Sequence, residues 1–195
     1  MLIVDCADVA ARATAIAAAL AAGVDAVQLR DRAASARTLL AAGTALRAWT
    51  RAHGAALLVN DRIDVARTLG ADGVHLPAAS FPLDVARHLL GPEPLIGRST
   101  HAAAEAEAAA GADYVILGPI FDTPSKRAYG PPLGPAVLAA AGAAPPVVAI
   151  GGVTAANAAA LVRAGAHGVA VVREVLEASD PAAAGTALIR AITEA

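Results

Sequence analysis

Short apolar runs alternate with alanine-rich amphipathic stretches from one end of the chain to the other. Four of the runs, here called the glycine-led repeats, open with a glycine and continue into Val, Ile or Leu: GVDAVQL from Gly23, GADGVHL from Gly70, GADYVIL from Gly111 and GAHGVAV from Gly165. A glycine in this place is typical of the left-handed turn that ends a helix. The apolar run after it predicts a strand that is buried on both faces.

Four further apolar runs lie between these repeats and complete a set of eight predicted strands. They are Leu2–Cys6, Ala56–Asn60, Pro94–Ser99 and Pro146–Gly152. Helical stretches separate the strands, for example Ser35–Arg51, Pro82–Leu90, Ala102–Ala110 and Ala155–Arg163. Strict alternation predicts a parallel sheet, and self-similarity at alternate strands favours a closed (β/α)8 barrel. We therefore expect an α/β protein, with one compact TIM-barrel domain over residues 1–195.

Composition limits the cellular compartment and the classes of binding partner that we expect. The formal net charge is −2 and Lys and Arg are scattered, so we expect no nucleic-acid partner. The long uncharged stretch that includes Ala128–Ala160 is interrupted by Pro and Gly and does not predict a membrane span. The single cysteine, Cys6, excludes an intrachain disulfide and fits a reducing compartment. We expect its side chain to be a small buried residue of a strand rather than a nucleophile. We expect a cytoplasmic protein without a signal peptide and leave a homo-oligomer open.

In a barrel of this kind, chemistry belongs where strands end and loops begin. The second predicted strand leads into Gln28, Arg30 and Arg32, and alternation points the first two to the same side. An amide and two guanidiniums suit a polyanionic ligand, because the planar fork of arginine binds phosphate oxygens in pairs. The alternative is a salt-bridged rim in which Asp31 neutralises an arginine.

The ends of the third and fifth strands offer a carboxylate and a histidine. Asn60 and Asp61 could hold a hard cation such as Mg²⁺ through oxygen ligands, or they could cap the following helix. Ser99 and Thr100 could likewise cap a helix. His101 is a candidate general acid or base, with a structural hydrogen bond as the alternative.

The last three strand ends predict a second anion site. Thr123, Ser125 and Lys126 would form a cradle of two hydroxyls and an ammonium after the sixth strand. Gly151 and Gly152 end the seventh strand, and the eighth ends in Val171, Val172 and Arg173. Loops in these places often bind phosphate through backbone N–H groups. Because the two anion sites differ, the sequence predicts an enzyme that acts on two phosphorylated small molecules.

Several motifs along the chain resemble the thiamine phosphate synthase/TenI family. They are VQLRDR, LLVNDR, DGVHLP, IGRSTH, ADYVILGPIFDTPSK, GPPLG, VVAIGGVT and GAHGVAVV, and they cover nearly the whole chain in family-like order. The resemblance implies a (β/α)8 barrel that uses Mg²⁺. It further implies a reaction in which hydroxymethylpyrimidine diphosphate loses pyrophosphate, and the resulting pyrimidine methyl cation is attacked by the nitrogen of a thiazole phosphate.

The resemblance also assigns roles to residues of this chain. It implies that Asp61 ligates Mg²⁺ and that Ser99 contacts the pyrimidine. The implied diphosphate contacts are Gln28, Arg30, Asn60 and Lys126. The residues implied around the thiazole and its phosphate are Thr123, Ser125, Gly152, Val172 and Arg173.

Two departures from the synthase pattern, set against one synthase-like residue, leave the branch open. Pro77-Ala78-Ala79-Ser80 stands where family synthases carry a Gly-Gln-Glu-Asp-like run, so Ser80 replaces the second Mg²⁺ carboxylate. Arg32 replaces a lysine, and both changes resemble TenI thiazole tautomerases. Pro119, however, is synthase-like, because the tautomerase has a proton-moving histidine there. We favour a synthase with a metal site reduced to Asp61. The alternatives are a metal-independent tautomerase using His101 and a barrel that binds thiazole phosphate without catalysis.

Overall fold

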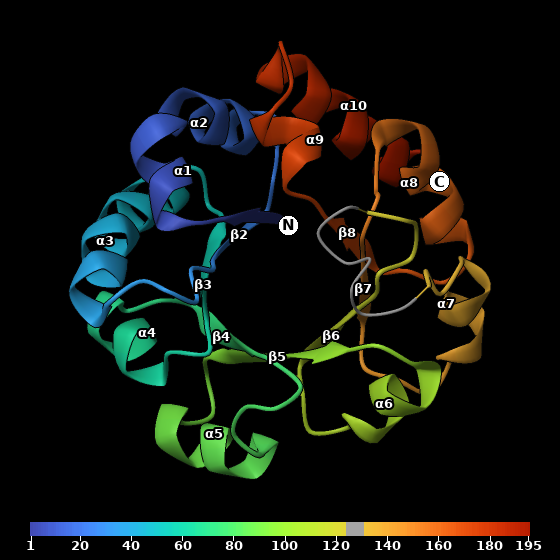
Figure 1. Ribbon diagram of the computed structural model, residues 1–195, viewed down its shortest axis with the longest axis horizontal. Helices are drawn as coiled ribbons and strands as arrows, with labels where there is room; N and C mark the ends of the chain where they lie inside the picture. Colours follow the sequence, from blue (N-terminus) through green and yellow to red (C-terminus); the bar gives the residue numbers. More distant parts are fainter. Residues whose placement is uncertain (124–130) are drawn as a thin grey trace.

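Eight parallel strands form a barrel in the computed structural model, which describes residues 1–123 and 131–195 (Figure 1). Each strand pairs with the next in chain order, from β1 to β8. The ring is completed beside β8, where Val171 bridges to Leu2 and accepts a 2.9 Å hydrogen bond from the Ile3 N–H. The predicted barrel is therefore confirmed. The strands are β1 Leu2–Val4, β2 Ala26–Leu29, β3 Ala56–Asn60, β4 Gly73–Leu76, β5 Leu95–Thr100, β6 Tyr114–Leu117, β7 Val147–Ile150 and β8 Gly168–Ala170.

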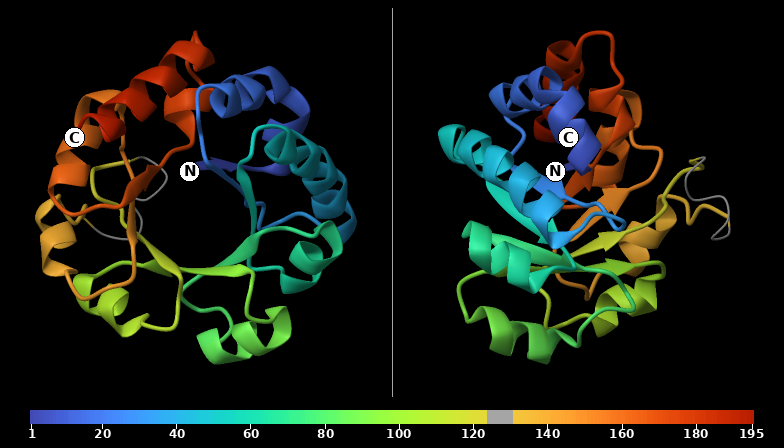
Figure 2. Two further views of the ribbon diagram at one scale, coloured as in Figure 1. Left: turned by 180° about the vertical axis from the view of Figure 1, so that it is seen from behind. Right: turned by 60° about the vertical axis from the view of Figure 1, so that its left-hand side comes forward.

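Helices surround the strands as an outer ring (Figure 2). They are α1 Cys6–Ala11, α2 Ala13–Ala21, α3 Ala36–Ala52, α4 Ile63–Leu69, α5 Leu83–Leu90, α6 Ala103–Ala108, α7 Ala136–Ala140, α8 Ala155–Arg163, α9 Arg173–Leu176 and α10 Pro181–Thr193. The C-terminal helix α10 packs against α2 near the start of the chain, so the two ends of the sequence close the ring together (Figure 1). No helix in the described residues is long and apolar enough to cross a membrane.

The first strand is shorter than predicted, because a helix cap ends it. Asp5 accepts a 2.7 Å hydrogen bond from the Asp8 N–H, and the Asp8 carboxylate accepts one from the Asp5 N–H. This reciprocal pair starts α1 at Cys6. The prediction that Cys6 is a strand residue was wrong. Burial, and secondarily the Asp31 carboxylate, raise the pKa of the Cys6 thiol to about 11, so the thiol stays protonated and is a poor nucleophile.

Alternation along the strands divides the buried side chains into two sets. Residues such as Val27, Leu57 and Leu117 are fully buried in the main core, which the helices cover. Leu58, Tyr114 and Ile116 form a second cluster inside the barrel. The prediction of strands that are buried on both faces is confirmed.

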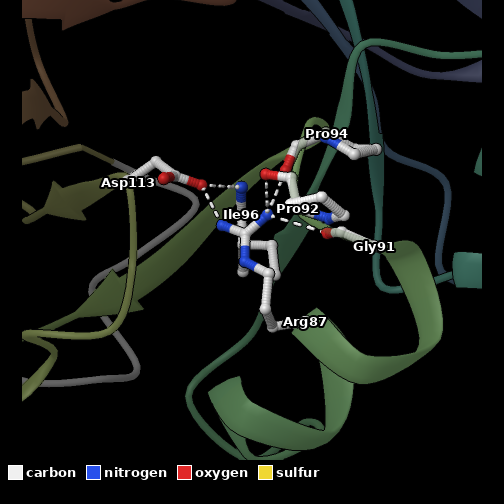
Figure 3. A network of polar contacts seen from close by, with 6 residues as sticks. All are labelled: Arg87, Gly91, Pro92, Pro94, Ile96 and Asp113. Atoms are coloured by element: carbon white, nitrogen blue, oxygen red, sulfur yellow. Dashed lines mark hydrogen bonds and ion pairs between the residues drawn. The ribbon is translucent and has the colours of Figure 1, made fainter.

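The aspartates of two glycine-led repeats tie neighbouring strands together at the end where the strands begin. Asp113 accepts 2.7 Å and 2.6 Å hydrogen bonds from the Ile96 N–H and from Arg87 (Figure 3). The same guanidinium donates to the Pro94 carbonyl at 2.6 Å and so fixes the connection between α5 and β5. Asp72 makes the equivalent bond to a strand N–H at 2.7 Å. In these two repeats the aspartate therefore stabilises the fold at the end where the strands begin. The residues available for chemistry lie at the opposite ends of the strands.

Candidate active site

A cavity of about 1040 Å³ opens where the strands end. This volume lies at the upper end of the range of about 300 to 1,000 Å³ that is usual for ligand pockets. The predicted site residues at its walls are Gln28, Arg30, Arg32, Ser99, His101, Thr123, Gly151, Gly152, Val172 and Arg173. The barrel thus brings strand ends that lie far apart in the sequence to one cavity.

A second, smaller cleft of about 320 Å³ holds the remaining described candidates. Asn60, Asp61 and Ser80 line it, and Arg32 belongs to the walls of both hollows. The predicted carboxylate therefore lies beside the main cavity rather than in it, with one guanidinium shared between the two. Ser125 and Lys126 lie outside the described residues.

Asp61 is fixed by its backbone and by a neighbouring hydroxyl. Its φ of 65° lies in the left-handed region, which non-glycine residues adopt rarely and Asp and Asn more readily than most. Its N–H donates to the His75 carbonyl at 2.9 Å, and Ser80 Oγ–H donates to Asp61 Oδ1. The residue at the N-terminus of α4 is Arg62, without a side-chain capping bond. The alternative prediction, that Asp61 caps this helix, was wrong.

A buried polar chain crosses the inside of the barrel at the floor of the cavity. His75, only 2% exposed, lies 2.8 Å from Ser99 Oγ through Nε2 and 3.2 Å from the Tyr114 hydroxyl through Nδ1. Gly97 pairs with both His75 and Tyr114 in the sheet, and a Cβ there would stand 2.1 Å from the Tyr114 ring. The absent side chain at position 97 gives the tyrosine ring its place.

Burial keeps both rings of this chain uncharged. It lowers the pKa of His75 to about 3, with the Arg30 and Arg98 charges as lesser causes, and it raises the pKa of Tyr114. A neutral imidazole has one donor and one acceptor nitrogen, so one hydroxyl neighbour donates to His75 and the other accepts. Ser99 Oγ is thereby oriented at the cavity wall.

The His75 environment predicts a pH-dependent stability. An exposed histidine in the unfolded chain binds a proton below about pH 6.5, but folded His75 does so only near pH 3. Its contribution is therefore complete above pH 6.5 and is lost as the pH falls towards 3. Between pH 7 and 5 we expect a loss of about 2 kcal/mol from this residue, measured by urea unfolding.

The matched variants for this measurement are His75→Gln and His88→Gln. His88→Gln changes an exposed histidine on α5 and should retain the wild-type difference between pH 7 and 5. His75→Gln keeps a polar side chain but should lower that difference by about 2 kcal/mol. The same pH dependence in His75→Gln and in the wild type would contradict the assignment.

The ends of β7 and β8 form a rim of backbone at the other side of the cavity. Gly151 and Gly152 have φ of 100° and 63°, and the Asn157 side chain holds the Gly152 carbonyl at 3.0 Å. Arg173 begins the short helix α9 and donates to Thr123 Oγ1 at 2.9 Å. Because the first N–H groups of a helix have no partner within it, this rim can offer donors to an anion.

His101 and its neighbours make structural contacts at this mouth. His101 is exposed, its Nδ1 lies 2.7 Å from the Gly118 carbonyl, and its N–H donates to Glu105 at 2.7 Å. The helix α6 begins after Ala102, without a side-chain capping bond. The alternative that Ser99 or Thr100 caps this helix was therefore wrong, because their side chains turn to His75 and to the Ile116 carbonyl.

Comparison with known proteins identifies the family. A family model described as thiamine monophosphate synthase matches residues 1–175. This chain belongs to the thiamine monophosphate synthase family. The thiamine-phosphate synthase of Roseiflexus castenholzii is 49% identical over 175 residues, which are 88% of this chain and 77% of that protein. The thiamine-phosphate synthase of Moorella thermoacetica is 45% identical over 181 residues, 91% of this chain and 86% of that protein.

Solved structures agree with this placement in the thiamine monophosphate synthase family. Thiamine phosphate pyrophosphorylase from Pyrococcus furiosus superposes with a TM-score of 0.88 and 32% identity, over 99% of this chain and 95% of that one. The resemblance that the sequence motifs carry is therefore confirmed, as is the barrel.

The sequence analysis named Ser99 as a site residue but missed His75 and Tyr114, the other two side chains of the buried polar chain. Both lie in the glycine-led repeats, in GADGVHL and GADYVIL, which we read as apolar strands. The signal was alternation: apolar Val74 and Leu76 face the helix-covered core, so the residue between them must face the barrel interior. A glycine inside the intervening strand was a second sign, since it marks a close approach.

Proposed function

We propose that this chain is a thiamine-phosphate synthase, a transferase that joins hydroxymethylpyrimidine diphosphate to thiazole phosphate and releases pyrophosphate. One observation carries the proposal: two groups of candidate anion donors, unlike in chemistry, line one cavity. Arg30 and Arg32 supply guanidiniums from the end of β2, while Gly151, Gly152 and the start of α9 supply backbone donors. Two rims of unlike chemistry suit two unlike phosphorylated substrates. The names of the relatives at 49% and 45% identity support the same reaction.

The pyrimidine substrate would bind across the β2, β3 and β5 ends. We assign diphosphate contacts to Gln28, Arg30 and Asn60, with Lys126 as the further family residue. Arg32 would serve the same anion, since it reaches both hollows. Ser99, oriented by neutral His75, would face the polar edge of the pyrimidine.

The thiazole phosphate would bind at the opposite rim. Its phosphate would accept hydrogen bonds from backbone N–H groups of Gly152, Val172 and Arg173, with Gly151 shaping the turn. Thr123, which Arg173 holds at 2.9 Å, would contribute a hydroxyl, and Ser125 would add another. His101 would border the thiazole without acting as a proton carrier, because the synthase reaction needs none.

The chemistry in this proposal is mainly electrostatic. The carbon–oxygen bond to the diphosphate breaks, its electrons leave with pyrophosphate, and the thiazole nitrogen donates an electron pair to the pyrimidine methylene cation. Arg30 and Arg32 stabilise the charge that develops on the leaving group, where fixed charges in a water-poor site are most effective. The two rims hold carbon and nitrogen in reach of each other, which converts a bimolecular step into a positioned one.

The residues of the small cleft fit Mg²⁺ as part of a complex with the substrate. Asp61 and the Asn60 amide are oxygen ligands of the kind that Mg²⁺ prefers, and the metal commonly uses one or two carboxylates together with substrate phosphates. The described residues contain no group of three or more His, Cys, Asp or Glu that could hold a metal alone. Bound there, Mg²⁺ would neutralise charge on the departing diphosphate.

The deciding experiment measures thiamine phosphate from both substrates, with Mg²⁺ and again with EDTA. The proposal expects product only with Mg²⁺. Absence of product, together with a metal-independent proton shift on a thiazole carboxylate phosphate, would replace the synthase with the tautomerase. Binding of thiazole phosphate without either reaction would make the barrel a binding protein. We further propose that residues 1–195 act as one domain in the cytoplasm, with these small molecules as partners and without nucleic-acid or membrane partners.

A further inference from the structure

We propose that Glu174 is a positioning residue for the thiazole phosphate: its carboxylate fixes the loop after β7 relative to the start of α9. The inference rests on the proposed function and adds to it a residue that acts through the backbone rather than by touching the substrate. It concerns the contact between Glu174 and Ala155, the first residue of α8.

The Glu174 carboxylate ties two connections of the barrel together. The N–H groups in the first turn of a helix have no partner within that helix, and α8 begins at Ala155. Glu174 Oε1 accepts a 3.0 Å hydrogen bond from the Ala155 N–H, although the two residues lie 19 positions apart. A carboxylate at the N-terminus of a helix is favoured by the helix dipole and makes a charge-assisted hydrogen bond. The contact therefore joins the connection after β7 to the connection after β8.

The turn between β7 and α8 also has internal bonds of its own. Asn157 Oδ1 accepts from the Thr154 N–H at 2.9 Å, and Asn157 Nδ2 donates to the Gly152 carbonyl at 3.0 Å. Because these bonds join residues of one connection, they hold the shape of the turn. Glu174 adds a bond that places the turn relative to the end of β8.

Arg173, the neighbour of Glu174, makes a second contact of this kind. Its guanidinium donates to Thr123 Oγ1 at 2.9 Å, across 50 positions of the sequence. Two consecutive side chains at the start of α9 therefore hold two different segments, one after β6 and one after β7. The thiazole phosphate is proposed to bind between these same segments. A shift of α9 by about 1 Å relative to them would misplace its hydrogen-bond donors enough to impair the reaction.

The negative charge of Glu174 distinguishes positioning from direct electrostatic binding. Glu174 and Glu177 both line the main cavity, and a carboxylate repels a phosphate. If charge were the whole effect, removal of the Glu174 side chain would tighten the binding of a phosphate. If the carboxylate positions the loop, its removal must weaken binding even though a like charge is lost. The sign of the change therefore decides between the two roles.

Binding of thiazole phosphate, measured by isothermal titration calorimetry with and without inorganic pyrophosphate, tests this sign without turnover. Glu174→Ala should bind at least about tenfold more weakly than the wild type, because the Ala155 N–H loses its acceptor and the loop is released. Glu174→Gln keeps an acceptor at the same chain length without the charge. Its affinity should lie within about threefold of the wild type or be higher.

Glu177→Ala is the matched control for the loss of charge. Glu177 lines the same cavity, is exposed and lies at the other end of α9. Removal of its carboxylate should leave the affinity for thiazole phosphate within about threefold of the wild type, or raise it, because only a screened repulsion is lost.

Hydrogen exchange and steady-state kinetics separate positioning from a loss of fold. The Ala155 amide should exchange faster in Glu174→Ala than in the wild type or in Glu174→Gln, while circular dichroism stays unchanged. The KM for thiazole phosphate should rise in Glu174→Ala, and the KM for the pyrimidine diphosphate should stay close to wild type. Should Glu174→Ala fail to fold, Glu174→Asp is the second variant: it keeps the charge, shortens the side chain and should also weaken binding.

The results that would overturn the inference differ in what they say of the function. Unchanged or tighter binding of thiazole phosphate by folded Glu174→Ala would refute the positioning role while leaving the synthase proposal intact. Equal losses in Glu174→Ala and Glu174→Gln, or in Glu174→Ala and Glu177→Ala, would assign the effect to the lost charge and refute the role of the hydrogen bond. Failure of the wild type to bind thiazole phosphate under either condition would refute both proposals, because no thiazole phosphate site would remain.

Discussion

Replacing Asp61 by asparagine is expected to lower kcat/KM of the synthase reaction by about a thousand-fold. Removing a charged group that stabilises a leaving anion through a metal forfeits several kcal/mol of transition-state stabilisation, and each 1.36 kcal/mol is a factor of ten. Asparagine is the right replacement because it tolerates the left-handed backbone, here with φ of 65°, better than alanine does. The measurement is steady-state formation of thiamine phosphate at saturating Mg²⁺.

The control for this prediction is Asp84→Asn. Asp84 is exposed on α5, outside the walls of both hollows, so removal of its charge should leave kcat/KM within a factor of about two. Full activity in Asp61→Asn would remove Asp61 from the reaction and, with it, the proposed metal position. An unfolded Asp61→Asn would be recognised by circular dichroism, and Ser80→Ala would then probe the same carboxylate through its hydrogen bond.

Replacing Gly152 by alanine is expected to lower kcat/KM for thiazole phosphate by about a hundred-fold. The new Cβ would stand 2.7 Å from Phe121 Cβ and 3.0 Å from the Asp122 carbonyl, so the rim must shift. A displacement of about 1 Å in a positioning element can cost a factor of a hundred. The loss should fall on the KM for thiazole phosphate, with the KM for the pyrimidine diphosphate close to wild type.

Gly54→Ala separates this clash from simple backbone strain. Gly54 has φ of 67°, close to the 63° of Gly152, but an added Cβ there meets no atom of the described residues within 4 Å. Backbone strain alone should cost both variants roughly 1–2 kcal/mol of stability, because left-handed backbone disfavours a Cβ. Only Gly152→Ala should lose activity. Equal activities in the two variants would show that the β7 rim does not bind the thiazole phosphate.

Much of the fold followed from local pattern. The glycine-led repeats placed β2, β4, β6 and β8 to within a few residues, and Ala155–Arg163 is the helix that the periodicity predicts. The error at Cys6 came from reading an apolar run without its cap: Asp5 and Asp8 satisfy one another and convert the end of that run into a helix. The reciprocal hydrogen bonds of Asp5 and Asp8 thus explain why the strand ends before Cys6.

The sequence by itself determined the barrel, the family and the strand ends at which chemistry belongs, because period, turn glycines and motif order are properties of neighbouring residues. Only the tertiary structure decided that His75 and Tyr114 join Ser99 and that Ser80 reaches Asp61. It also decided that Asp61 occupies a cleft beside the main cavity. These contacts join residues 19 to 39 positions apart. Their energies depend on distance, burial and the charges brought close by closing the barrel, which local sequence pattern does not encode.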